Sequence, residues 1–185
     1  MDENELIDHT KASMLGALEH LKQEFRGIRA GRASGAIIEG VQVEVYGSQM
    51  RLKELGTITT PESRQLLITP FDINNAGPIS KAIDKANLGV RVSLEGKLVR
   101  VFFPELDEAR RKDLVGQVHK KREDCKVSIR NIRRDSNEKL KEMKTADLPE
   151  DTAKRLEKHN QDMTNHHCKE ADDLAATKEK EIMHV

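Results

Sequence analysis

The chain has 185 residues and carries 32 basic and 32 acidic side chains, so its net charge gives no information about a charged partner. Charged residues make up 35% of the chain and aromatic residues only 3%, with one Tyr and no Trp. This composition suits a helical protein and argues against an aromatic platform that stacks unpaired bases. The two cysteines are too few for a disulfide framework. No apolar run approaches the ~20 residues that cross a bilayer, and the acidic amino terminus lacks the features of a targeting signal. We therefore expect a cytoplasmic protein with no membrane association.

The first ~27 residues have the period of an amphipathic helix. Asp2 and Glu5 resemble a capping pair at its start. The helical pattern stops at residues 30–35, where glycine and small residues supply flexible backbone. The apolar residues of this first helix recur at steps of four and three: Met14, Leu18, Leu21, Phe25 and Ile28.

The sequence of residues 31–104 predicts a small α/β domain. Val41, Val43 and Val45 alternate with polar residues, which is the period of a strand. One amphipathic helix begins at Pro78, and Pro104 ends the segment. Further short strands are expected near residues 57–59, 66–69, 90–94 and 98–103.

The helical period returns at residue 106 and runs to about Met143. A third helix follows, with Asp147 as its candidate N-cap, and Asn160 and His167 dilute its apolar seam. Each of the three helices can bury only one stripe, so we expect them to associate.

The predicted fold class is therefore α+β: a long three-helix bundle with a small α/β domain inserted between helix 1 and helix 2. The bundle comprises residues 1–30 and 105–185, and the inserted domain comprises residues 31–104. We expect hinges near residues 30–35 and 103–106, although rigid corners would fit the same sequence. The hinge residues are Gly31, Ser34, Gly35 and Pro104.

Basic residues concentrate on the second long helix. Residues 110–135 carry ten basic and four acidic side chains, whereas residues 147–185 carry six basic and ten acidic ones. A basic stripe at helical spacing matches the regular charges of a nucleic-acid backbone. The alternative is a set of solvated charges that pair with nearby carboxylates or are neutralised by the acidic third helix. The stripe consists of Lys112, His119, Arg122, Lys126, Arg130 and Arg133.

Motifs of enzyme chemistry are missing from the sequence. There is no phosphate-binding loop, no dinucleotide-binding glycine motif and no nucleophile elbow. The residues with metal-ligand chemistry are His166, His167 and Cys168, with His159 nearby. Adjacent helical residues diverge by about 100°, so we expect them not to converge on one ion. The sequence thus predicts a protein that is not an enzyme and has no metal and no cofactor.

Several motifs in sequence order resemble the bacterial-type ribosome recycling factor family. They are Gly27-Ile28-Arg29-Ala30-Gly31-Arg32-Ala33-Ser34, Val43-Glu44-Val45-Tyr46-Gly47, Arg110-Arg111-Lys112-Asp113-Leu114, Val127 to Asp135, and Lys178 to Met183. The resemblance implies a monomeric translation factor that binds the large subunit of the post-termination ribosome. With elongation factor G and GTP it would then promote subunit splitting.

The resemblance also implies the site. Arg133 would be the leading contact with ribosomal RNA, beside Arg130, Asn131 and Arg134, with Arg29 and Arg32 near the neck of the bundle. Lys126 and Arg122 extend this RNA-binding set along the stripe. The chain departs from the family at Gly35 and Glu39, where the family usually has proline and aspartate.

Two other functions remain open from the sequence. A helical adaptor would bind a partner helix through apolar contacts, although the sequence shows no exposed apolar stripe. An enzyme built on the α/β insert would require a bound substrate or metal.

Overall fold

The computed structural model describes residues 2–146 and 148–183. The chain forms two compact units. One contains Met1–Phe25 and Val115–Glu179, and the other contains Arg26–Leu114 and Lys180–Val185. The first is a helical bundle, and the second contains all the strands of the described residues.

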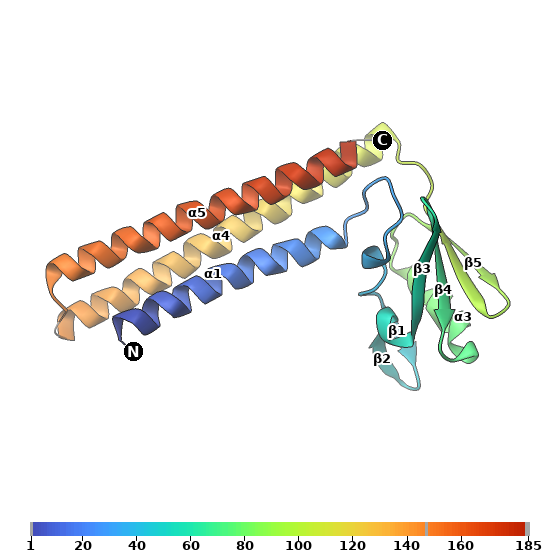
Figure 1. The fold of residues 1–185 in the computed structure, drawn as a ribbon, viewed down its shortest axis with the longest axis horizontal. Coiled ribbons are helices and arrows are strands. Elements are labelled where there is room, and N and C mark those ends of the chain that lie inside the picture. Colours follow the sequence, from blue (N-terminus) through green and yellow to red (C-terminus); the bar gives the residue numbers. More distant parts are fainter. Residues whose placement is uncertain (1, 147, 184–185) are drawn as a thin grey trace. The chain divides into compact units, whose positions relative to one another are not determined.

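Three long helices build the bundle: α1 (Glu3–Arg26), α4 (Glu108–Ala146) and α5 (Glu150–Met183) (Figure 1). The predicted cap of α1 is confirmed, because the Glu5 amide donates to Asp2 Oδ1 (2.8 Å) and the Asp2 amide donates to Glu5 Oε2 (2.9 Å). Asp107 caps α4 through the amide of Arg110 (2.7 Å). The predicted cap of α5, Asp147, lies outside the described residues. None of the helices in the described part of the chain is long and apolar enough to span a bilayer.

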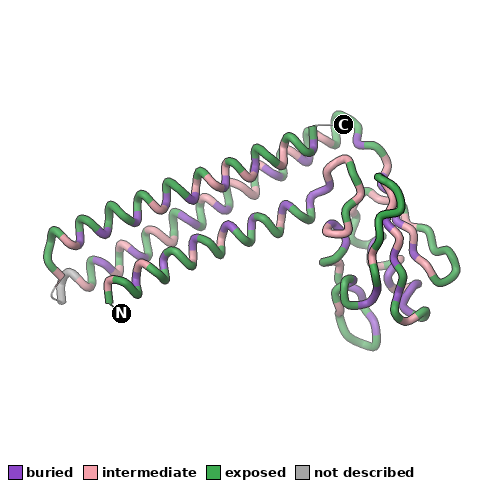
Figure 2. The backbone as a smooth tube through the Cα atoms, viewed as in Figure 1, coloured by how far each residue is buried: buried purple, intermediate pink, exposed green. Residues whose placement is uncertain are grey.

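Buried residues recur along one side of each long helix and form the bundle core (Figure 2). The apolar seam predicted for α1 is buried from Met14 to Phe25. On α4 and α5, Ile129 and Leu140 are fully enclosed and Leu156 is 5% exposed. Burial of a leucine or isoleucine side chain contributes roughly 1.5–3 kcal/mol, so this seam holds the helices together.

Polar residues also lie in the bundle core, and their polar groups make hydrogen bonds there. Asn160 Nδ2 donates to Ser136 Oγ (2.9 Å) and to Asn137 Oδ1 (3.0 Å). Ser136 Oγ in turn lies 2.9 Å from Thr10 Oγ1, in a hydroxyl–hydroxyl hydrogen bond. Thr10, Ser136 and Asn160 come from α1, α4 and α5, so this polar network joins all three helices. Asn160 was expected to dilute the apolar seam; it is a hydrogen-bonded part of it.

The α/β unit contains a two-stranded hairpin and a four-stranded antiparallel sheet. Strands β1 (Gln42–Val45) and β2 (Ser48–Arg51) form the hairpin. The larger sheet has the order β3-β4-β6-β5, and it is built from Gly56–Glu62, Gln65–Pro70, Leu98–Phe102 and Arg91–Glu95 respectively. The predicted strands are therefore present. The predictions missed β2 and the short helix α2 (Leu52–Leu55), which follows it.

Helix α3 (Ala76–Lys85) covers this unit's apolar core. It begins two residues before the predicted start at Pro78. Ile79 and Ile83 are fully buried among residues of both sheets, including Val43 and Val99. The predicted fold class, α+β with a long three-helix bundle and a small strand-containing segment between its first two helices, is confirmed.

One glycine is required for close strand pairing. Gly56 pairs with Pro70 across β3 and β4, and a Cβ at Gly56 would lie 2.6 Å from the Thr69 carbonyl oxygen. The backbone of Gly56 is extended, a conformation that any residue can adopt. Glycine is therefore required here because there is no space for a side chain. We expect Gly56→Ala to lower the free energy of unfolding by about 1–3 kcal/mol, as measured by urea denaturation.

Gly77→Ala is the matched control for this substitution. A Cβ at Gly77 would meet nothing within 4 Å, and the residue lies in α3. Because alanine favours helix over glycine by up to about 1 kcal/mol, this variant should be neutral or more stable. Equal losses in the two variants would contradict the role of space at Gly56.

Candidate nucleic-acid interface

Three arginines on one stretch of α4 carry charges that no carboxylate among the described residues neutralises. We call Arg130, Arg133 and Arg134 the arginine patch. Arg130 and Arg134 are exposed and make no hydrogen bond or ion pair with the described residues. Arg133 is half-buried and its Nη1 donates to Gln161 Oε1 of α5. Because an amide carries no net charge, Arg133 keeps its full positive charge while its position is fixed.

A polar relay from α5 holds Arg133. Gln161 Nε2 donates to Asn165 Oδ1 (2.8 Å), one turn further along α5, which orients the amide oxygen toward Arg133. Asn131 is exposed beside the arginines. A guanidinium with one edge held by the protein can offer its other N–H groups to phosphate or to a base edge. The roles of Gln161 and Asn165 were not predictable from the sequence, because they depend on how α4 and α5 pair.

The other half of the predicted stripe is neutralised. Lys126 Nζ lies 3.1 and 3.2 Å from the two carboxylate oxygens of Asp172, and Arg122 Nε lies 3.6 Å from the same group. His119 Nε2 lies 3.0 Å from Glu179 Oε2. Carboxylates therefore engage this half of the predicted stripe in the structure, and RNA contact by Arg122 and Lys126 stays a prediction.

Arg29 is not an exposed basic residue. Only 7% of it is exposed, its guanidinium lies over the ring of Phe103 (5.4 Å to the centroid), and its Nη1 donates to the Gly89 carbonyl (3.1 Å). Burial, and then the charges of Arg110 and Arg64, lower the pKa of Arg29. The structure thus gives Arg29 a packing role within the α/β unit, which disagrees with its predicted RNA contact. Arg32 belongs to the same unit and is exposed.

Neighbours of the predicted hinge residues are hydrogen-bonded within the α/β unit on both chain segments. The Ala33 amide donates to the Ser63 carbonyl (2.8 Å), and the Phe103 amide donates to the Arg64 carbonyl (2.8 Å). Gly35 begins a 3₁₀ turn, Gly35–Ile37, that follows Ser34. These bonds define where regular structure begins beside Gly31 and Pro104, and hinge motion there stays a prediction.

Neither cysteine is poised for nucleophilic chemistry. The Cys125 thiol is buried and donates to the Ala17 carbonyl (3.5 Å), and burial raises its pKa to about 11. Burial also raises the pKa of Cys168. Since the thiolate is the reactive form, both side chains stay protonated near neutral pH.

The imidazole rings of His166 and His167 lie close together, which their divergence around the helix did not predict. Their ring centroids lie 5.3 Å apart, and both rings reach the carboxylate of Glu170. Long side chains can converge although their Cα–Cβ bonds diverge around the helix. Cys168 does not belong to this group: the charges that act on its thiol are those of Lys126 and Arg130 of α4, with Asp172 and Glu123.

The fold and this surface define a class of protein: an α+β protein whose long three-helix bundle presents a group of arginines, one of which, Arg133, is held in position by Gln161. The family profile described as ribosome recycling factor matches residues 21–183. The chain belongs to the ribosome recycling factor family, and it is therefore a translation factor by family rather than a classical enzyme.

Relatives resemble the chain over nearly its whole length. The ribosome-recycling factor of Chlamydia caviae is 43% identical over 97% of this chain and 98% of its own length. That of Staphylococcus saprophyticus is 41% identical over 98% of this chain and its own full length.

Two solved structures each cover all of this chain. A solution structure of a ribosome recycling factor has 37% sequence identity and a TM-score of 0.78. The other, with 39% identity and a TM-score of 0.67, describes the Thermus thermophilus ribosome recycling factor and Escherichia coli elongation factor G bound to the E. coli post-termination complex.

Proposed function

We propose that this chain binds the large subunit of the post-termination ribosome through the arginine patch and, with elongation factor G and GTP, promotes subunit splitting. The observation that carries the proposal is the set of guanidinium groups that no carboxylate of the bundle neutralises. Ribosomal RNA supplies the phosphates that such groups bind.

The relative in the post-termination complex supports this partner assignment, since it is 39% identical and is described together with elongation factor G. Arg133 leads the proposed contact because Gln161 fixes it, and Arg130, Asn131 and Arg134 lie beside it. Lys126 and Arg122 are secondary members of the interface, because Asp172 already engages them.

We further propose that residues 1–30 and 105–185 act as the RNA-binding domain and that residues 31–104 act as the domain on which elongation factor G works. Movement between them would occur near residues 30–35 and 103–106. The short helices and strands between these segments bury a core of their own, which supports independent movement of this domain.

A subunit-splitting assay tests the function directly. Post-termination ribosomes are mixed with elongation factor G and GTP, with and without this chain, and splitting is followed by light scattering. We expect fast loss of the 70S signal only when all components are present. Equal splitting rates with and without the chain would contradict the proposed function.

A further inference from the structure

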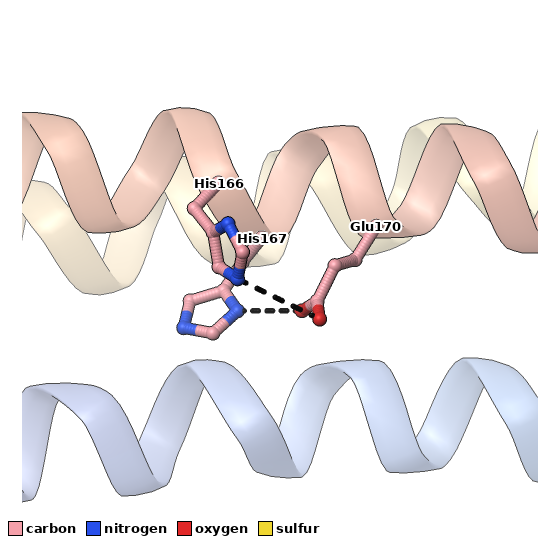
Figure 3. A group of neighbouring side chains, drawn as sticks. All are labelled: His166, His167 and Glu170. Atoms are coloured by element: carbon pink, nitrogen blue, oxygen red, sulfur yellow. Dashed lines mark hydrogen bonds and ion pairs between the residues drawn. The ribbon is translucent and has the colours of Figure 1, made fainter.

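Three potential metal ligands meet on α5, away from the arginine patch. They are Nε2 of His166, Nδ1 of His167 and the carboxylate of Glu170, and these ligand atoms all lie within 4.8 Å of one another (Figure 3). His167 Nδ1 is 2.9 Å from Glu170 Oε2, and His166 Nε2 is 3.7 Å from Glu170 Oε1. Neighbouring ligands of one ion are separated by similar distances, since metal–nitrogen and metal–oxygen bonds are about 2.0–2.2 Å long.

The helix and the bundle together hold this cluster in place. Glu170 follows His166 by four residues and His167 by three, so its carboxylate lies over the same turn as both rings. His167 is only 5% exposed, because the bundle packs around it. Figure 3 shows both rings and the carboxylate on the side of α5 that faces α1. One buried ligand therefore sets the position, and two more exposed ones can close on an ion.

Solvent has access to the cluster. The His166 side chain is 69% exposed, and Glu170 lines a groove of about 610 Å³ between α1 and α5. Leu15 and Leu174 line the same groove. An ion could enter without unfolding of the helix, and water could complete its coordination.

We propose that His166, His167 and Glu170 form a binding site for a divalent transition-metal ion, with Zn²⁺ as the preferred occupant. Two imidazoles and one carboxylate are a zinc ligand set, and an open fourth position would hold water. The hard oxygen-only coordination that Mg²⁺ and Ca²⁺ require is not available from two imidazoles. This site shares no residue with the proposed ribosome contact.

The carboxylate of Glu170 supplies the negative charge of the cluster. The hydrogen bond from His167, and then the charges of His166, His167 and Lys22, lower the pKa of Glu170, so its carboxylate is ionised. Lys22 of α1 opposes a cation, but it pairs with Glu19 at 4.0 Å. Metal binding would displace the proton shared between His167 and Glu170, since a ligating imidazole nitrogen must be unprotonated.

Calorimetric titration of the full chain, prepared without a histidine tag, tests the site with ZnCl₂ as the probe. We expect one ion per chain. His166→Ala and Glu170→Gln should each weaken binding by at least about tenfold. His159→Ala removes an exposed histidine two turns earlier on α5 and should leave the affinity unchanged.

Circular dichroism distinguishes unfolding from loss of the metal site. Both variants should stay helical, because His166 and Glu170 are not core residues. Binding of Co²⁺ should add visible absorption bands in the parent chain and in His159→Ala but not in the other two variants. The absence of saturable binding in the parent chain would overturn the proposal, as would equal affinity in the parent chain and His166→Ala.

Discussion

Charge reversal at Arg133 is expected to weaken binding to the large ribosomal subunit by about 1–3 kcal/mol, on the order of ten- to a hundredfold in affinity. Arg133 keeps its positive charge because its partner in the bundle is the amide of Gln161. In Arg133→Glu, a carboxylate would face phosphate, and a counterion that the arginine displaces would no longer be released. The measurement is ribosome co-sedimentation at several salt concentrations. The salt dependence of binding should decrease together with the affinity.

A control variant separates a site effect from a general effect of charge. Lys11→Glu makes the same change of charge at an exposed position on α1 and should bind nearly as well as the parent chain. All these positions are helical, and Glu has nearly the helix propensity of Arg and Lys, so helicity should be unchanged. Full affinity of Arg133→Glu for the subunit would rule out Arg133 as the leading contact.

The same binding experiment also tests whether the stripe consists of a free half and a neutralised half. Arg130→Gln removes a charge that has no partner among the described residues, whereas Arg122→Gln removes one that Asp172 and Glu123 engage. Arg130→Gln should therefore weaken ribosome binding more. Equal losses would show that the ion pairs of Arg122 open on the ribosome.

The long elements were predictable because each shows one period over many residues. A helix as long as α4 repeats its apolar seam many times, so Leu114, Val118 and Ile129 identify it without tertiary information. Strand β2 and helix α2 have four residues each, which is too short for a period to emerge. They are fixed instead by pairing with β1 and by burial of Leu52 and Leu55.

The site was predictable only in its residue types. The run from Arg130 to Arg134 is visible in the sequence, but whether a charge is free depends on which residue of α5 lies opposite it. Antiparallel pairing of α4 and α5 brings Asp172 to Lys126, 46 positions apart along the chain, and Gln161 to Arg133, 28 positions apart. The burial of Arg29 is likewise set by Phe103 and Gly89, which are distant in sequence.

The histidines show a different limit of sequence reasoning. The angle of 100° between neighbours describes where side chains leave the helix, and it does not describe where their distal atoms end. His166 and His167 reach one carboxylate because imidazole rings are long and Glu170 lies one turn on. Whether such side chains can bind one ion therefore depends on the positions of their ligand atoms and not on residue spacing alone.

The polar network of the bundle core is the feature on which we expect stability to depend most. Asn160→Ala would remove the donor to both Ser136 Oγ and Asn137 Oδ1 and leave a space in the seam. A buried acceptor that loses its partner costs about 1–3 kcal/mol, so the free energy of unfolding should fall by roughly that amount. Urea denaturation followed by circular dichroism measures this change. Thr164→Val is the matched control, because the Thr164 hydroxyl donates to the Asn160 carbonyl of its own helix and should contribute little.

We also expect the same network to fix the alignment of the three helices. Replacing Thr10, Ser136 and Asn160 together by Val, Ala and Leu removes the three side chains that link the helices through Ser136 Oγ and leaves only the part-buried Asn137 of the network. The triple variant should therefore regain most of the stability that Asn160→Ala loses. The apolar seam alone specifies the register of the helices less strictly than hydrogen bonds do. Faster amide exchange around residue 136 in the triple variant, at equal global stability, would show that the network sets the register. Unchanged exchange there would show that apolar packing sets it without help.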